Sequence, residues 1–361
     1  MSVLKHLLIV TPGFPKDKDD TSCLPAVQQF ILCYKRLHPE ITFTIISLHY
    51  PFDQKHYCWN GMEVYSLRGQ NKNGIRRGGT ILRAIRKGLS VNRTNNIDAV
   101  LAFWLTDAAL AAKYISRSIH APILIWMHGQ DAKAGNKYVS YVHPAPDDLA
   151  AISDYQNEVF KKAHGFKAGH IIYNGVNKNI FPALNFDDRD IDLVSVGSLI
   201  PLKRQHMFIE LVQQLKATDK NIKAVVAGEG ILQGELTHQI KEAGLDDNIT
   251  LTGGINHEAV LKLMNRAKIL VHTSEYEGHS TVILEALYSG CYVLSFLPIA
   301  GRETENFILC KDTEEMLQQC KIILSKHQVA RRVLVSDMDD RAEQVHHILT
   351  SKLSHADNSR S

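Results

Sequence analysis

The sequence predicts an α/β protein with two doubly wound domains that face each other across a cleft. The chain has 361 residues, more than one ordinary hydrophobic core accommodates. Short apolar runs rich in β-branched residues alternate with helical stretches, a pattern typical of parallel sheets covered on both faces. The alternation stops once, at an acidic irregular stretch, and then starts again. This interruption divides the chain into two similar domains.

We therefore expect a first domain at 1–176, a linker at 177–190 and a second domain at 191–335. Residues 336–361 are expected to form a last helix, which crosses back to the first domain, and a polar tail. For the first domain the pattern predicts strands at 6–11, 42–48, 63–67, 99–104, 123–127, 150–153 and 170–173, with helices at 25–37, 80–89, 107–119 and 156–163. For the second domain it predicts strands at 192–196, 222–227, 249–252, 269–272 and 292–296, with helices at 205–217, 232–243, 257–265 and 281–289.

The composition excludes several classes of protein. Apolar residues make up 45% of the chain and charged residues 22%, which are values of globular and not of disordered proteins. The six cysteines lack the spacing of a zinc site or a disulfide framework, so we expect free thiols and a cytoplasmic protein. The apolar run near the N-terminus is too short for a signal peptide. No run approaches the ~20 apolar residues of a membrane span.

Positive charge is concentrated in the first half of the chain. Residues 1–184 hold 22 Lys and Arg against 13 Asp and Glu, whereas residues 185–361 hold 19 against 25. The segment 68–93 alone contains eight Lys and Arg and no acid, with Ile and Leu at roughly helical spacing. Such a segment can bind the anionic inner face of a membrane peripherally. Alternatively, it is a solvated basic helix whose apolar side packs on the sheet. We expect no nucleic-acid partner, because no groove-reading motif is present.

The stretch 274–290, SEYEGHSTVILEALYSG, is the principal candidate for a binding site. A helix expected to begin at Thr281 would point the N–H groups of its first turn beyond the preceding strand, where phosphate binds readily. Glu277 lies before this helix and Glu285 about one turn inside it. Two carboxylates beside an anion site suit a ligand with phosphates in the middle and hydroxyls at each end, such as a nucleotide sugar. Alternatively, Glu277 caps the helix and Glu285 is solvated.

Further candidates follow other strands. Gly13, in the sequence TPGFP, would let a ligand approach the main chain, although an ordinary turn is as good an interpretation. His128 opens the sequence HGQD, where it could hydrogen-bond a sugar hydroxyl, polarise a leaving group or serve a structural role. Lys203 precedes a helix, where it could meet a diphosphate or lie on the surface. Residues 228–234, GEGILQG, nearly match the dinucleotide fingerprint, with one residue too many before the last glycine.

Several of these segments together resemble one family. In the second domain they are 196–203 (VGSLIPLK), 227–230 (AGEG), 251–253 (LTG) and Glu277 to Glu285 as an E-x7-E pair. The HGQD sequence and two short segments of the first domain, IS and NGV, are similar to the same family. The chain resembles glycosyltransferase family 4, whose members are retaining enzymes with the GT-B fold of two Rossmann-like domains.

The resemblance implies a role for each matching position. Lys203 would hold the donor diphosphate, Glu285 the ribose hydroxyls and Glu277 the transferred sugar. Main-chain N–H groups near the start of the helix would meet the phosphates, and His128 would lie near the sugar where the acceptor enters. The implied catalytic residues are His128, Lys203 and Glu277. The implied donor-binding residues are Gly13, Gly197, Ser198, Lys203, Gly228, Glu277, Gly278, Ser280, Thr281, Val282 and Glu285.

This chain departs from the family pattern at several positions. The family usually has an arginine where Ser198 stands, so one diphosphate cation is missing or supplied elsewhere. His279 replaces a common aromatic residue and Ser280 a common glycine. The N-terminal loop has one glycine, Gly13, where many members have two.

From these observations we expect a retaining glycosyltransferase. It would move a sugar from a UDP or GDP conjugate to a glycan or lipid-linked glycan, in surface polysaccharide assembly. We expect neither a metal ion nor another cofactor, since no HExxH, P-loop or clustered Cys and His residues occur. The alternatives are a sugar-nucleotide epimerase or phosphorylase on the same two-domain plan, and a non-catalytic partner of another transferase that binds nucleotide sugar or glycan.

Overall fold

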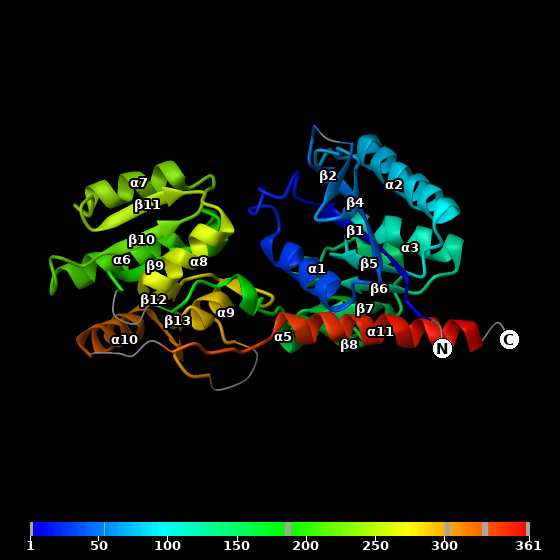
Figure 1. Cartoon of the computed structure of the whole chain (residues 1–361). Coiled ribbons are helices and arrows are strands. Elements are labelled where there is room, and N and C mark those ends of the chain that lie inside the picture. The colour runs from blue at the N-terminus through cyan, green and yellow to red at the C-terminus, as the bar shows by residue number, and fades with distance from the viewer. Residues whose placement is uncertain (1–2, 54, 185–188, 300–303, 327–330, 359–361) are drawn as a thin grey trace. The chain divides into compact units, whose positions relative to one another are not determined.

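The computed structural model describes residues 3–53, 55–184, 189–299, 304–326 and 331–358, with side chains up to residue 355. Its contacts divide the chain into two compact units (Figure 1). Unit 1 comprises Met1–Asn174 together with Met338–Ser361, and unit 2 is the continuous segment Gly175–Asp337.

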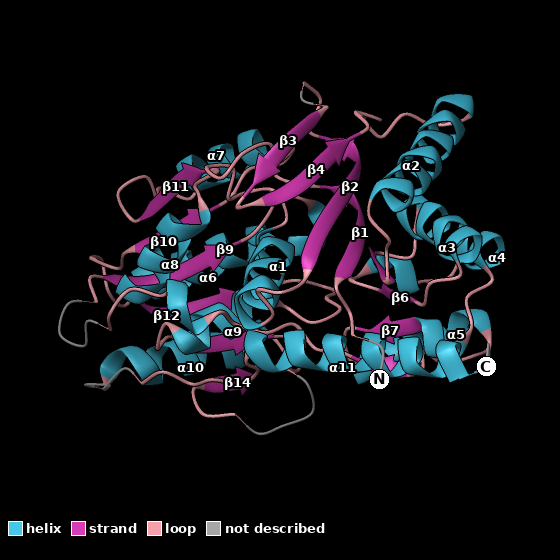
Figure 2. Cartoon of the chain, turned by 45° about the vertical axis from the view of Figure 1, so that its right-hand side comes forward, coloured by secondary structure: helices cyan, strands magenta, loops and turns pink. Residues whose placement is uncertain are grey.

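Unit 1 contains an eight-stranded sheet with the order β3-β4-β2-β1-β5-β6-β7-β8. All neighbouring strands are parallel except β3 and β4, which form an antiparallel hairpin. The strands are β1 (His6–Gly13), β2 (Thr42–Tyr50), β3 (His56–Trp59), β4 (Met62–Ser66), β5 (Ala99–Phe103), β6 (Ile123–Trp126), β7 (Leu149–Ala151) and β8 (His170–Ile171). The central strands β5 and β6 are apolar throughout, and β1 is apolar over residues 7–10, because helices cover both faces of the sheet (Figure 2).

Two hydrophobic clusters fill the two faces of this sheet. One joins it to α1 (Pro25–Leu37) and α11 (Met338–Asn358), through residues such as Phe30 and Val345. The other joins it to α2 (Ile75–Thr94), α3 (Asp107–Ile119) and α5 (Asp154–His164). The short helix α4 (Tyr138–Val142) contributes its buried residues to the second cluster.

Helix α11 completes the core of unit 1, although it follows unit 2 in the sequence. Val345 and Leu349 are fully buried in the cluster that contains α1. Polar contacts fix the helix further along its length. The Gln344 side chain donates to the Ile171 carbonyl at 2.9 Å, and the Lys352 ammonium lies 2.7 Å from the Asp148 carboxylate.

Unit 2 contains a six-stranded, fully parallel sheet with the order β11-β10-β9-β12-β13-β14. The strands are β9 (Ile191–Val196), β10 (Ala224–Ala227), β11 (Ile249–Gly253), β12 (Ala267–His272), β13 (Tyr292–Ser295) and β14 (Phe307–Leu309). One face is covered by α6 (Gln205–Lys216), α7 (Gln233–Glu242) and α10 (Thr313–Ser325). The other is covered by α8 (His257–Arg266) and α9 (Thr281–Tyr288).

The segment 177–190, expected as a linker, is part of unit 2, and its described residues contact the rest of that unit. The Arg189 guanidinium donates to the Ser289 carbonyl at 2.6 Å, and the Asn265 amide donates to the Ala183 carbonyl at 2.8 Å. Residues 185–188 lie outside the described residues.

Some elements differ from the sequence-based prediction. The antiparallel strand β3 was not expected, and it exists because Asn60 and Gly61, both with positive φ, form a two-residue hairpin turn to β4. Helix α2 begins at Ile75 rather than at residue 80, and its exposed first turns include Gly78 and Gly79 although glycine has a poor helix propensity. Strand β1 extends to Gly13, which pairs with Tyr50 across a register shift, so this glycine is not in the loop that was expected.

None of the helices in the part of the chain that the structure describes is long and apolar enough to cross a bilayer.

The substitution Leu349→Ala should destabilise unit 1, because it opens a cavity where α11 packs against the sheet. We expect a loss of about 2–5 kcal/mol, with less than about 0.5 kcal/mol for the exposed His347→Ala on the same helix. Denaturant unfolding followed by tryptophan fluorescence isolates this effect, since all three tryptophans lie in unit 1. Equal midpoints for both variants would contradict the assignment of α11 to this core.

Candidate functional site

Two glycine-containing loops meet at the carboxyl edge of the sheet in unit 2. Gly197 follows β9 and Gly228 follows β10, both at φ 151°. A Cβ atom added at Gly228 would lie 1.9 Å from the Gly197 carbonyl oxygen, and one at Gly230 would lie 2.3 Å from the Leu199 carbonyl oxygen. Contact between the two main chains therefore accounts for both glycines of the GEG sequence. The partial match to a dinucleotide fingerprint needs no other explanation.

Lys203 lies across this contact. It ends the short 3-10 helix Pro201–Lys203, and the stem of its side chain passes over Gly197, where an added Cβ would meet Lys203 Cε at 3.5 Å. The Thr273 hydroxyl donates to the Lys203 carbonyl at 2.7 Å. The segment after β12 thus holds the main chain that carries the lysine.

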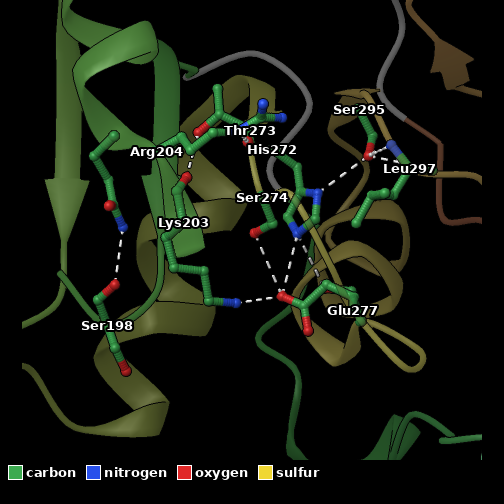
Figure 3. A network of polar contacts seen from close by, with 11 residues as sticks. Ser198, Lys203, Arg204, His272, Thr273, Ser274, Glu277, Ser295 and Leu297 are labelled. Carbon is green, nitrogen blue, oxygen red and sulfur yellow. Dashed lines mark hydrogen bonds and ion pairs between the residues drawn. The ribbon is translucent and has the colours of Figure 1, made fainter. Parts of the chain in front are cut away.

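The Glu277 carboxylate is the centre of a polar network in unit 2 (Figure 3). Its Oε1 forms an ion pair with the Lys203 ammonium, lies 3.5 Å from His272 Nε2 and accepts a 3.4 Å hydrogen bond from the Ser274 hydroxyl. Burial alone would raise the pKa of Glu277, but the hydrogen bond that the protonated His272 ring donates and the charge of Lys203 outweigh burial and hold the pKa at about 2. Glu277 is therefore an anion at neutral pH.

His272 connects this network to the next strand. It is the last residue of β12 and is almost fully buried. Its Nδ1 lies 3.1 Å from the Ser295 hydroxyl, at the end of β13, and that hydroxyl bonds to both main-chain polar groups of Leu297. Burial lowers the pKa of His272, and the carboxylate of Glu277 opposes this shift only in part.

Glu285 belongs to a separate contact. Its Oε1 lies 2.8 Å from Nε2 of His257, the first residue of α8, and both side chains are largely buried. Burial lowers the pKa of His257, but the hydrogen bond and the negative charge of Glu285 outweigh burial, and the net direction is upward. A carboxylate held in this way is fixed on α9 rather than free to rotate in solvent.

The start of α9 lies beside these groups. Ser280 is the residue before the helix, and its side chain makes no capping hydrogen bond, so Thr281 and Val282 begin the helix with main-chain N–H groups that lack a partner within it. Gly278 lies in the bend before them. A small pocket at this edge is lined by residues of β9, β12 and α9, including Val196, Lys203, His272, Ser274 and Val282.

At position 198, where the family usually has an arginine, this chain has a serine, and the nearby Arg204 makes contacts elsewhere. Ser198 is exposed, and its carbonyl accepts a 3.0 Å bond from the Gln205 side chain. The next cation, Arg204, donates from Nε to the Thr273 carbonyl at 2.9 Å and lies 5.5 Å from the ring centroid of Phe296. Lys203 is therefore the cation in contact with the Glu277 carboxylate among the described residues.

His128 and Gly13 belong to unit 1. The His128 ring lies 4.9 Å from Trp104 and 4.6 Å from Trp126, between ring centroids, and its buried Nε2 has no hydrogen-bond partner among the described residues. Burial lowers the pKa of His128 to about 3, so the imidazole is neutral at pH 7. A Cβ at Gly13 would make only ordinary contacts, the nearest at 3.7 Å to Tyr50, so local packing does not require a glycine there.

The structure thus brings the predicted residues of unit 2 to one edge of its sheet, with Glu277 and Lys203 in direct contact. Sequence reasoning missed the two histidines, His272 and His257, that hold the two glutamates. A signal existed for His272, because a polar residue that ends an apolar parallel strand points at the edge where ligands bind. No spacing rule indicated His257, which lies 28 positions before Glu285.

Within the described residues there is no group of three or more His, Cys, Asp or Glu side chains that could hold a metal ion.

Parts of the chain are similar to known glycosyltransferases. Residues 176–304 match the family model described as glycosyl transferases group 1. A Campylobacter jejuni relative, N-acetylgalactosamine-N,N'-diacetylbacillosaminyl-diphospho-undecaprenol 4-alpha-N-acetylgalactosaminyltransferase, is 27% identical over 179 residues, which are 48% of this chain and 48% of that protein. The match therefore spans about half the length of this relative.

Two further similarities extend over more of the chain. A second C. jejuni protein, GalNAc-alpha-(1->4)-GalNAc-alpha-(1->3)-diNAcBac-PP-undecaprenol alpha-1,4-N-acetyl-D-galactosaminyltransferase, is 24% identical over 284 residues, covering 73% of this chain and 75% of its own. The crystal structure of Anabaena HepE in complex with UDP and glucose has a TM-score of 0.67 and 16% identity, and the similarity covers 99% of this chain and 100% of that one.

Two Rossmann-like units, the second with its polar network at the carboxyl edge of a parallel sheet, define the GT-B fold of glycosyltransferases. Within unit 2, residues 176–304 are similar to the glycosyl transferases group 1.

The substitution Gly228→Ala should destabilise unit 2, because its Cβ would collide with the Gly197 carbonyl. Overpacking of this kind costs about 1–3 kcal/mol, and the positive φ adds strain. As a control, Gly234→Ala at the start of α7 meets nothing within 4 Å and should leave stability unchanged or raise it by up to about 1 kcal/mol. Calorimetric unfolding of the two variants measures this difference in stability. Equal melting temperatures would contradict the close contact between Gly228 and the Gly197 carbonyl.

Proposed function

We propose that the protein is a retaining glycosyltransferase of family 4. It transfers a sugar from a nucleoside-diphosphate sugar, with UDP or GDP as the nucleotide, to a glycan or lipid-linked glycan acceptor in surface polysaccharide assembly. The observation that carries this proposal is the Lys203–Glu277 pair beside the start of α9. It combines a cation and helix N–H groups for a diphosphate with a carboxylate for sugar hydroxyls.

The reaction depends mainly on positioning and charge. The bond from the anomeric carbon to the diphosphate breaks, and the acceptor oxygen bonds to that carbon on the same face through an oxocarbenium-like state. The acceptor proton passes to the departing diphosphate. Lys203 and the N–H groups at Thr281 and Val282 stabilise the charge on this leaving group, so the step needs no metal ion. Retention is checked by the anomeric configuration of the first-formed product in an NMR time course.

His128 is assigned to the acceptor side of the reaction. Its low pKa keeps the imidazole neutral, so it acts as a hydrogen-bond partner and not as a cationic acid. The buried Nε2 atom has no partner among the described residues, and we assign to it a hydrogen bond with a sugar hydroxyl. The cost of leaving this buried polar atom unsatisfied supports a ligand-binding role over a purely structural one.

The acceptor class follows from the relatives and from α2. The two C. jejuni relatives are named for undecaprenol diphosphate substrates. In this chain, Ile75 is 96% exposed and Leu82 is 56% exposed on α2, and the exposed Arg83 and Arg86 lie on the same helix. Other residues of α2, such as Ile81 and Ile85, pack on the sheet, so the helix has a packed side and a basic, partly apolar outer side. We assign the outer side to peripheral contact with the inner membrane face.

Donor binding tests the site. One of UDP, GDP or ADP, or a sugar conjugate of one of them, should raise the melting temperature of the wild type. It should raise that of Lys203→Ala much less, because the diphosphate loses its cation. Glu285→Ala should weaken binding by about 1.5–3 kcal/mol, the worth of hydrogen bonds to a charged group. The exposed acid Glu235 on α7 supplies the control, since Glu235→Ala should bind normally. No shift with any nucleotide would favour a non-catalytic partner of another transferase.

Charge reversal on α2 tests the membrane contact. The double variant Arg83→Glu with Arg86→Glu should bind anionic vesicles at least about thirtyfold more weakly, at about 1 kcal/mol for each cation lost. Co-sedimentation with phosphatidylglycerol vesicles measures this effect. Arg117→Glu, which reverses an exposed cation on α3, is the matched control. Equal binding by the double variant and this control would remove α2 from the proposal.

A further inference from the structure

The hydrogen bonds around Ser295 determine which nitrogen of His272 carries a proton. The Ser295 hydroxyl donates its one hydrogen to the Leu297 carbonyl at 2.9 Å and accepts from the Leu297 N–H at 3.0 Å. Its remaining lone pair faces His272 Nδ1 at 3.1 Å (Figure 3). With the hydroxyl hydrogen directed at the Leu297 carbonyl, Nδ1 is the donor in this contact, and we assign the Nδ1–H tautomer to neutral His272.

This tautomer leaves a lone pair on His272 Nε2. That atom lies 3.5 Å from Glu277 Oε1 and 3.5 Å from the Ser280 hydroxyl. The neutral ring can accept a hydrogen bond from Ser280, but it can only repel the carboxylate. A protonated ring would instead donate from Nε2 to Glu277. In the structure described here, the Lys203 ammonium neutralises Glu277, so the neutral ring is tolerated.

We propose that His272 is a positioning residue that takes up a proton when the donor binds. The inference rests on the proposed function. The donor diphosphate attracts the Lys203 ammonium away from Glu277, and the proton that enters at His272 Nε2 replaces it as the counter-charge. Glu277 is then held in place, with Oε2 free for the hydroxyls of the transferred sugar.

The charged groups that act on His272 are Glu277, from the turn before α9, and Lys203, from the loop after β9. Burial and the positive charge of Lys203 lower the pKa of His272, whereas Glu277 raises it. Withdrawal of Lys203 removes one of the two lowering effects, so the pKa rises on binding. Donor affinity should then increase as the pH falls from the bound-state pKa to the free-state pKa, by up to about tenfold per pH unit.

Calorimetric titration with UDP-glucose and GDP-mannose tests the proton uptake. Each phosphate of these donors carries one ester bond and one anhydride bond, so neither phosphate titrates near neutral pH. Binding to the wild type in Tris and in PIPES at the same pH should give different enthalpies, because the two buffers release the proton with different heats. Two variants provide controls. His272→Gln keeps an N–H donor toward Glu277, and His272→Asn keeps one toward Ser295. Both should bind with enthalpies independent of the buffer.

The outcomes separate the two proposals. If neither these two donors nor any other UDP, GDP or ADP sugar binds the wild type, the proposed function fails and this inference fails with it. Binding with equal enthalpies in the two buffers overturns the role of His272 alone. Buffer-dependent binding that persists in His272→Gln overturns it as well, because the proton then enters elsewhere.

A second measurement needs no donor. Lys203→Met removes the ammonium and leaves a chain of similar length, so it imitates the bound state. Long-range proton–nitrogen NMR spectra of the ring, assigned by their loss in His272→Gln, should show the Nδ1–H tautomer in the wild type. They should show a higher pKa of His272 in Lys203→Met. An Nε2–H tautomer or an unchanged pKa would refute the proposal.

Discussion

The close approach of two main-chain loops at the carboxyl edge of the second sheet determines where the polar groups of unit 2 lie. The main chain at Gly228 lies so close to the Gly197 carbonyl that a Cβ atom does not fit between them. The loops after β9 and β10 therefore form one surface. The Lys203 side chain lies across Gly197 and reaches Glu277. A parallel sheet brings these loops to the same edge, and the glycines let them meet there.

The charges at this edge are stabilised by contacts from different strands and helices. Glu277 is held by groups that follow β9 and β12, and Glu285 by the first residue of α8. Neither carboxylate depends on solvent alone, so each keeps its orientation in a largely buried position. Oε1 of Glu277 has three polar neighbours, the Lys203 ammonium, the His272 ring and the Ser274 hydroxyl. Because these carboxylates are already oriented, a ligand that binds them loses less free energy to the ordering of side chains.

Much of this arrangement could be predicted from the sequence. Short apolar runs alternating with helical stretches predicted the two doubly wound sheets, and helices such as 25–37 and 107–119 were predicted with the observed bounds. Lys203 and Glu277 were expected in one site and are in contact. The histidine contacts were not predicted, because they join residues distant in sequence through side-chain geometry that no local pattern encodes. The hairpin at Asn60 was missed although Asn-Gly is a strong turn signal, since its strands are short.

Helix α11 has a consequence for synthesis of the chain. Unit 2 is continuous in sequence, whereas the core of unit 1 includes Ala342, Val345 and Leu349 from the far end of the chain. On the ribosome, unit 2 can be fully synthesised before α11, the helix that packs against the apolar side of α1, has left the ribosome. The half of the protein that is translated first is therefore the half that finishes folding last. An early release of the nascent chain would leave that surface open to association with other chains.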